Sequence, residues 1–368
     1  MVPEALPSQE HPGEALRNIV RTGDIERADR AFASLNNLPA GEAFNHLQLE
    51  VDDEIDVHRV VLAWRAMDTL EIAGDAWANC LLRQSIRYCA QTEKQILDQH
   101  RAPSPIRHVL PMLLDQYGLM GRELGRRIGD DVWLDELAES IFRGTREQAA
   151  HAVAQSLVDG YSPEAIGEAI SIAANRLVLH DPGRPQEWAN EEKPVGSVHG
   201  DSMGVHASDA ANAWRNIVRI SSPKNIVASL LVGAFHTGGQ SSRSTASPYP
   251  KEEDIDRIRD ENIHHLLAQT EEAIRNKDQF RAAAIVHRYG KLGHSERPML
   301  DLFLKFATSE DGALHAEKYY HTALKEFAST RPAFRWNQLV ALARVTASEY
   351  GKASPGYLAA RELLKVDV

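Results

Sequence analysis

The stretch from His180 to Gly239 gathers four of the chain's histidines within about sixty residues. Imidazole, with carboxylate, is a group that proteins use to transfer protons and to bind transition metals. His206 and Asp209 are three residues apart, so on a helix they would share one face. His236 lies inside the apolar run VGAFHTGG, where burying an imidazole is costly unless the ring is bonded or bound to a metal. We predict that His206, Asp209 and His236 are catalytic residues.

The same side chains could instead hold a divalent metal. Two histidines and one carboxylate are the usual ligand set of non-haem iron, and these groups also suit zinc or manganese, so iron is the favoured metal. We expect the ligands to come from five residues, which are His108, His180, His206, Asp209 and His236. Neither HExxH nor CxxC occurs. Acid/base histidines without a metal, or purely structural ones, therefore remain open, and the helix end expected at His180 alone would favour an imidazole there.

Two further groups of residues lie near this stretch. Arg215 and Arg219 are one turn apart in AWRNIVRIS and could bind a carboxylate or phosphate, so we predict that Arg215 and its neighbour Trp214 contact a substrate. Salt bridging is the commoner role for such arginines. The carboxylates after His180 could reach the same cavity, where burial would raise one of them into the range of a general acid; they are Asp181, Glu187, Glu191 and Glu192. Histidines in polar surroundings are expected at the surface, namely His264, His265, His315 and His321.

Helical spacing of apolar residues dominates the chain. Thr145 is placed to cap one helix, Gly160 to end it, and Ser162 with Pro163 to begin the next. Asp201 or Ser202 would cap a helix running to about Ile220. No alternating strand pattern lasts more than about four residues. We predict an all-α fold, a large domain of antiparallel helical hairpins or a helical array.

Proline, glycine and small polar residues suggest where the chain divides. Residues 1–13 have the composition of a flexible arm, and 14–240 are expected to form a helical domain that carries the site. Residues 241–250 are expected to be a loop or linker, able to act as a lid. Residues 251–368 should form a C-terminal helical region packed on the first.

Composition limits the class of protein. The chain has 368 residues, 43% hydrophobic and 25% charged, with a formal charge of −11 and scattered basic residues, which argues against a nucleic-acid partner. The longest apolar run, IVASLLVGAF, is far too short for a membrane span. Cys80 and Cys89 have neither disulfide nor metal-clip spacing and are expected to be buried thiols, and no signal peptide is recognised. We expect a cytoplasmic protein with a small-molecule substrate.

The residues GVHASDAANAWRNIVRISSPKNIVASLLVGAFHTGG, with the preceding LVLHDPG, resemble the questin oxidase-like all-α proteins. Related helical segments also occur behind Rieske domains. The likeness covers about residues 105–240, and its pattern is a histidine-bearing helix, a Ser-Pro break and an apolar helix with a second histidine. It implies an oxidase or oxygenase for an organic, polyketide-like substrate, with His206 and His236 at the matching positions. The chain lacks the Rieske cysteines, and its C-terminal third lies outside the match.

Two hypotheses follow from these observations. The first is an oxidoreductase with a cavity between helices, lined by the expected histidines and Asp209, that uses a divalent metal or acid/base histidines. The second is a helical-repeat binding or scaffold protein that has no catalytic activity and works through a concave surface.

Overall fold

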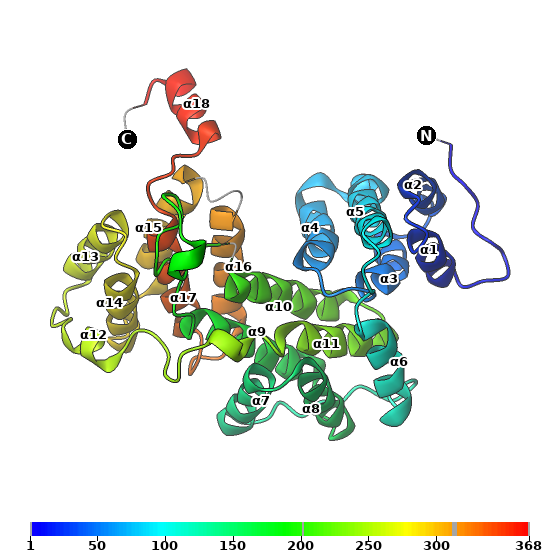
Figure 1. Cartoon of the computed structure of the whole chain (residues 1–368), viewed down its shortest axis with the longest axis horizontal. Helices are drawn as coiled ribbons and strands as arrows, with labels where there is room; N and C mark the ends of the chain where they lie inside the picture. The colour runs from blue at the N-terminus through cyan, green and yellow to red at the C-terminus, as the bar shows by residue number, and fades with distance from the viewer. Residues whose placement is uncertain (1, 201, 311–314, 367–368) are drawn as a thin grey trace. The chain divides into compact units, whose positions relative to one another are not determined.

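A computed structural model describes residues 2–200, 202–310 and 315–366, and it confirms the all-α prediction (Figure 1). Apart from 3₁₀ turns, the regular elements in these ranges are α-helices. The extended pairing found there is confined to isolated bridges, between Arg127 and Tyr161 and between Glu310 and Ala353. Apolar spacing of 3.6 residues therefore decides the backbone conformation nearly everywhere.

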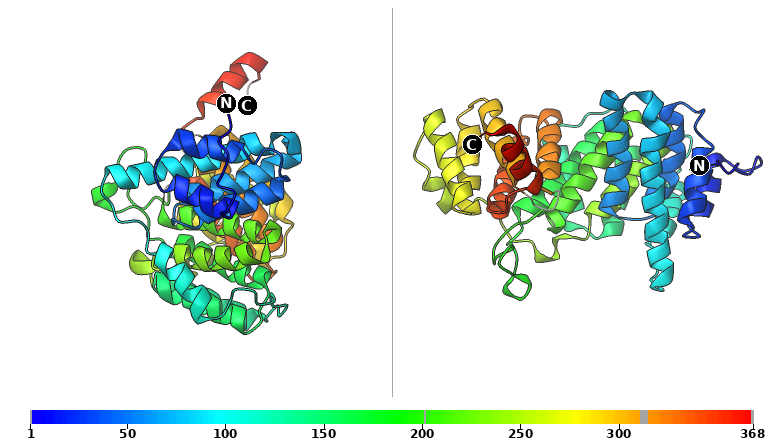
Figure 2. Two further views of the ribbon diagram at one scale, coloured as in Figure 1. Left: turned by 90° about the vertical axis from the view of Figure 1, so that its right-hand side faces the viewer. Right: turned by 90° about the horizontal axis from the view of Figure 1, so that it is seen from above.

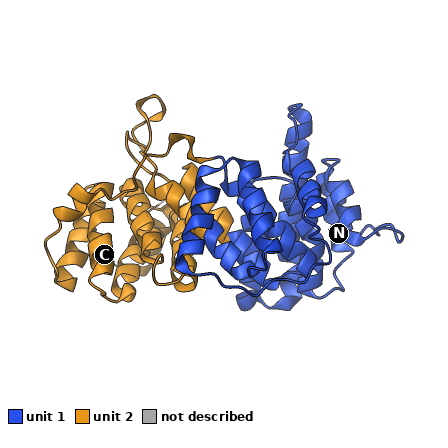
Figure 3. Cartoon of the chain, turned by 90° about the horizontal axis from the view of Figure 1, so that it is seen from below, with its two compact units in different colours: residues 1–170, 213–239 blue, residues 171–212, 240–368 orange. Residues whose placement is uncertain are grey.

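The chain folds into two compact units, coloured separately in Figure 3. Unit 1 comprises residues 1–170 and 213–239, and unit 2 comprises residues 171–212 and 240–368. The segment 171–212 thus groups with the C-terminal helices, whereas the sequence pattern places it with residues 14–240. Two helices contribute to both units, α9 (Pro163–Leu179) and α10 (Met203–Ile220).

Unit 1 is built from helices that pack in pairs. α1 packs on α3, α5 on both α2 and α4, and α8 on both α7 and α11. Their apolar faces meet in cores that include Phe32, Phe44 and Phe142. The helices are α1 (Pro12–Val20), α2 (Ile25–Ala33), α3 (Ala40–Val51), α4 (Val57–Ala73), α5 (Ala78–Asp98), α6 (Ile106–Gln116), α7 (Asp131–Arg143), α8 (Arg146–Val158) and α11 (Pro223–Thr237).

Unit 2 centres on α17, which packs against both α14 and α16, while α13 lies against α14 and α15 against α16 (Figure 2). Its core includes Tyr289, Phe303 and Tyr319. A run of consecutive antiparallel helices buries a continuous apolar layer in this way. The helices are α12 (Glu252–Asp256), α13 (Ile263–Arg275), α14 (Gln279–Lys291), α15 (Glu296–Ser309), α16 (His315–Ser329), α17 (Trp336–Glu349) and α18 (Pro355–Leu364).

The predicted helix ends around residue 160 are confirmed. Thr145 forms a capping box with Gln148, and Ser162 Oγ accepts a hydrogen bond from the backbone N–H of Ala165 at 3.2 Å. Gly160 has a positive φ of 81°, as a residue that ends a helix often does. Of the two residues expected to cap α10, Ser202 accepts from Val205 N at 3.4 Å, and Asp201 lies outside the described residues.

The cysteine prediction is correct for Cys89 and wrong for Cys80. Cys89 is fully buried on α5, and burial raises the pKa of its thiol to about 12, whereas Cys80 is exposed in the first turn of that helix. Both are free thiols. No described helix has the length and apolar character that crossing a bilayer requires.

A close crossing of α9 and α10 depends on Gly204. A Cβ built there would lie 2.8 Å from backbone atoms of Leu177 and Val178. Because these atoms belong to the backbone, rotation of a side chain cannot relieve the clash. We expect Gly204→Ala to lower the free energy of unfolding by about 1–3 kcal/mol, because overpacking outweighs alanine's better helix propensity. Thermal unfolding measures the change. Gly356→Ala on α18, where the nearest atom is 3.9 Å away, is the control, and equal stabilities of the two variants would contradict the prediction.

Candidate functional site

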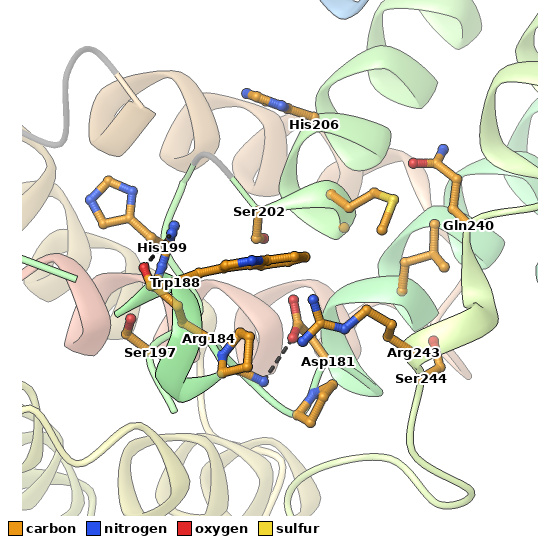
Figure 4. Close-up of a pocket in the computed structure, with 16 residues that line it drawn as sticks. Asp181, Arg184, Trp188, Ser197, His199, Ser202, His206, Gln240, Arg243 and Ser244 are labelled. Atoms are coloured by element: carbon orange, nitrogen blue, oxygen red, sulfur yellow. Dashed lines mark hydrogen bonds between the residues drawn. The ribbon is translucent and has the colours of Figure 1, made fainter. Parts of the chain in front are cut away.

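A cavity of about 460 Å³ opens in unit 2 beside the loop that follows α9 (Figure 4). This volume lies within the usual range for small-molecule sites. Its wall comes from the end of α9, described residues between 181 and 200, Ser202, the start of α10 and the segment 240–244. The lining residues are Leu177, Asp181, Pro182, Gly183, Arg184, Pro185, Trp188, Ser197, His199, Ser202, Met203, Gly204, His206, Gln240, Arg243 and Ser244.

His206 lies on this wall and also contacts a second histidine. Its Nε2 is 3.3 Å from Nε2 of His315, at the start of α16, and the ring centroids are 5.4 Å apart. At that separation one nitrogen can donate a proton and the other accept it. The expectation that His315 lies at the surface is wrong: it is half-buried, because α10 and α16 pack through these residues.

The predicted shared face of His206 and Asp209 is confirmed, since both side chains meet α16. Asp209 is buried, its Oδ2 lies 2.8 Å from Lys318 Nζ, and its Oδ1 accepts a hydrogen bond from Thr322 at 2.8 Å. One helical turn further, Asn212 donates to Glu326 at 2.7 Å. Asp209 therefore joins two helices through a buried ion pair, and its predicted part in catalysis or metal binding remains a prediction.

His199 lies in the loop before α10 and is held by the end of α17. Its Nδ1 is 3.7 Å from Glu349 Oε1, the same oxygen that accepts the backbone N–H of Gly200 at 2.8 Å. Ser348 accepts the backbone N–H of Val198 at 2.9 Å. A Cβ at Gly200 would collide with His315 and Glu349, so only glycine allows the loop to approach so closely. α16 and α17 thus fix both wall histidines from behind.

Asp181 is one of the four carboxylates expected to reach the cavity and to have a pKa raised by burial. Asp181 lines the cavity, and burial raises the pKa of its carboxyl group, although a hydrogen bond from Gly183 N at 2.7 Å and the charge of Arg344 act in the opposite direction. A carboxyl group with a raised pKa retains its proton closer to neutral pH, which is what a general acid requires.

Arg344 on α17 anchors the end of α9 beneath the cavity. The buried guanidinium donates to the carbonyl oxygens of Val178, Leu179 and Asp181 at 2.5–3.2 Å, and it lies 4.5 Å from the Tyr249 ring centre. Burial lowers its pKa to about 10, so the group is still charged at neutral pH. The cation satisfies carbonyls that a helix C-terminus leaves without partners.

His180 directly follows the last residue of α9, at the helix end that was predicted for it. Its Nδ1 lies 2.8 Å from the carbonyl oxygen of Thr245, and Thr245 N donates back to His180 O at 2.8 Å. The loop expected at 241–250 is tied to α9 by these bonds. They give His180 a structural role, and its ligand role remains a prediction.

The other predicted site residues lie in unit 1. His236 is buried on α11, with its Nδ1 3.5 Å from the indole nitrogen of Trp214. Trp214 is buried in the core and packed beside Gly233, and its predicted contact with a substrate remains a prediction. Arg215, likewise buried, is bonded to Glu164 at 2.7 Å, so the salt bridge is the role that the structure shows.

His108 on α6 is exposed, together with Met112. The buried side of this helix carries Ile106 and Leu113 instead. Pro111 also lies inside this helix. The ligand role of His108 remains a prediction, as does that of His236.

Arg184, Trp188 and Arg243 also line the cavity, although they were not predicted as site residues. Arg184 and Trp188 belong to HDPGRPQEW, an irregular segment directly after His180. A tryptophan and an arginine in a loop of glycine and prolines beside a histidine are a signal for a binding loop. Arg243 lies in the short 3₁₀ turn Ser241–Arg243.

Among the residues that the structure describes, no three or more His, Cys, Asp or Glu side chains are grouped so as to hold a metal ion. His206 and His315 are close enough to share one ion, but a third donor is not placed with them in that part of the chain.

Comparison with known proteins gives no match: no family model, curated protein or solved structure is similar to this chain.

Proposed function

We propose that this protein is an enzyme, an oxidase or oxygenase that acts on a small organic molecule in the unit 2 cavity. The observation that carries the proposal is the position of His206, which lines the cavity while its Nε2 faces His315 at 3.3 Å. A histidine that meets both a substrate cavity and a second imidazole is suited to accept a proton and pass it on. The reaction class rests on the resemblance of residues 105–240.

In the acid/base form, His206 removes a proton from an O–H or C–H group of the substrate. Dioxygen then takes two electrons and one proton from the resulting anion, takes a second proton from an acid of the wall, and is released as hydrogen peroxide. His315 shares the proton with His206, and Asp181, whose pKa is raised by burial, supplies a proton from another part of the wall. Proton transfer by positioned side chains contributes about 10²–10⁴-fold to a rate.

In the metal form, His206 and His315 would be the first ligands of an iron ion. Such an ion would activate dioxygen next to the substrate. Because the described residues supply two donors rather than three, the acid/base form has the stronger support. We further propose a cytoplasmic location and no nucleic-acid partner, supported by the free thiols Cys80 and Cys89 and the charge of −11.

We expect His206→Ala to lower the turnover rate at least 100-fold without unfolding the protein. Dioxygen uptake by the purified protein is measured with a panel of phenols, ketones and hydroxy acids, with and without added iron(II). Circular dichroism checks the fold.

His264→Ala, on the exposed face of α13, is the matched control and should retain full activity. Equal uptake by His206→Ala and the wild type would remove His206 from the mechanism. If the panel gives no uptake in either condition, the helical scaffold hypothesis replaces the enzyme. Metal analysis of the same samples separates the two forms, because only the metal form retains iron in stoichiometric amount.

A further inference from the structure

The charge on the cavity wall differs in sign from that of the whole protein. The chain carries −11, yet Arg184 and Arg243 both line the cavity, and among the lining residues that the structure describes Asp181 is the one acidic residue. The N-terminal end of α10, with Met203 and Gly204, opens into the same space and adds the partial positive charge of a helix start. A positive cavity in an acidic protein attracts anions and not cations.

Arg243 is placed to bind such an anion. Its guanidinium carbon lies 4.4 Å from the ring centre of Trp188, so the group is held over the indole face by a cation–π contact. Among the described residues no hydrogen bond from its N–H groups is found, although its charge acts on the carboxyl group of Asp181 and lowers the pKa of that group. A guanidinium that is held in place with its donors unused matches the two oxygens of a carboxylate.

Trp188 offers a flat apolar surface beside this group. Although it lines the cavity, its side chain is 58% exposed. Figure 4 shows the indole edge-on, with Ser202 and His206 on one side of its plane and Asp181 and Arg243 on the other. The guanidinium of Arg184 lies at the backbone of Trp188, where it donates to the carbonyl oxygen at 3.3 Å. Arg243 covers one face, and a ligand on the opposite side of the plane would lie on the same side as Ser202 and His206. Stacking on this face favours a planar conjugated group.

We propose that the cavity selects small organic carboxylates with a flat conjugated group: Arg243 binds the carboxylate, and Trp188 stacks on the flat group. This inference rests on the proposed function in taking the cavity as the substrate site. Beyond the proposed function, it specifies that the substrate is negatively charged and flat. The carboxyl group of Asp181 does not oppose an anion while it is protonated, and it can then donate a hydrogen bond to it.

Calorimetric titration of the full-length protein with 2-naphthoate and 2-naphthamide tests the proposal. The two probes have the same shape and differ in charge. We expect naphthoate to bind at least tenfold more tightly than the amide, and both to bind at least tenfold more tightly than inorganic phosphate, which lacks the flat group. Equal affinities for naphthoate and naphthamide, or no binding of naphthoate, would overturn the charge selection. Tighter binding of phosphate would overturn the stacking.

Variants locate the binding. Arg243→Gln should weaken naphthoate at least tenfold and leave naphthamide unchanged, whereas Trp188→Ala should weaken both. Arg257→Gln is the matched control, because Arg257 follows the last residue of α12, is 74% exposed and pairs with Asp254 outside the cavity. Binding is measured without turnover, so the two proposals can fail separately. If the protein binds naphthoate more tightly than naphthamide but shows no dioxygen uptake, only the oxidase proposal is refuted. Unchanged naphthoate affinity in Arg243→Gln would refute the present inference alone.

Discussion

Replacing Arg344 with methionine is expected to lower the free energy of unfolding of unit 2 by about 3 kcal/mol. Three backbone carbonyls at the end of α9 lose their donor, at about 1–3 kcal/mol each. Removing a buried charge offsets part of this loss, because burial of the guanidinium is itself costly. Urea-induced unfolding followed by circular dichroism measures the difference.

Two variants sharpen this test. Arg344→Lys retains a charge without the planar fork of donors, so its stability should lie between those of the wild type and the methionine variant. Arg297→Met removes an arginine that is 78% exposed on α15 and pairs with Asp301, and it should change stability by less than about 1 kcal/mol. A loss below 1 kcal/mol in Arg344→Met would show that the carbonyls of α9 find other partners.

Glu50→Gln is expected to make the stability of unit 1 less sensitive to rising pH. Glu50 on α3 is fully buried, and its two carboxyl oxygens have no hydrogen-bond partner among the described residues. Burial, together with the nearby charge of Asp53, raises the pKa of this carboxyl group well above its usual range. Glutamine keeps the shape of the side chain and removes the titration.

The sign of the effect follows from linkage between ionisation and folding. Below the ordinary pKa of about 4.5 the carboxyl group is protonated in both states, and above it the unfolded chain ionises while the folded chain does not. The wild type therefore loses about 1.4 kcal/mol per pH unit relative to Glu50→Gln until the folded group also ionises. Denaturant unfolding between pH 5 and 8 measures this.

The control for the loss of one negative charge is Glu42→Gln, at an exposed position on the same helix. The stability difference between Glu50→Gln and the wild type should grow with pH, and the corresponding difference for Glu42→Gln should not. A difference that stays constant from pH 5 to 8 would mean that Glu50 ionises in the folded protein as easily as in the unfolded chain.

Local features of the fold could be predicted because they depend on neighbouring residues. The caps at Thr145 and Ser162 require only a side chain and a backbone N–H three residues later, and both are present. The common face of His206 and Asp209 depends only on the helical repeat. Their orientation toward α16 did not follow from the repeat, because it depends on which helix packs against α10.

The cavity could be predicted only in part, because its supports are distant in sequence. His315 is 109 residues from His206, and nothing in its polar surroundings indicates the contact. Trp214 and Arg215 follow His206 closely along the same helix, yet helical rotation turns their side chains into the core and toward Glu164. Closeness in the sequence was therefore a poor guide to which residues share the site.

The residues that support the cavity wall also determine whether a truncated protein can keep the cavity. Its lining residues all lie between Leu177 and Ser244, so a fragment cut at the 241–250 loop would retain nearly all of them. That fragment would lack His315, Arg344 and Glu349, which hold the wall histidines and the end of α9. Proteolysis or truncation there would thus yield a polypeptide that contains the binding residues but no longer arranges them.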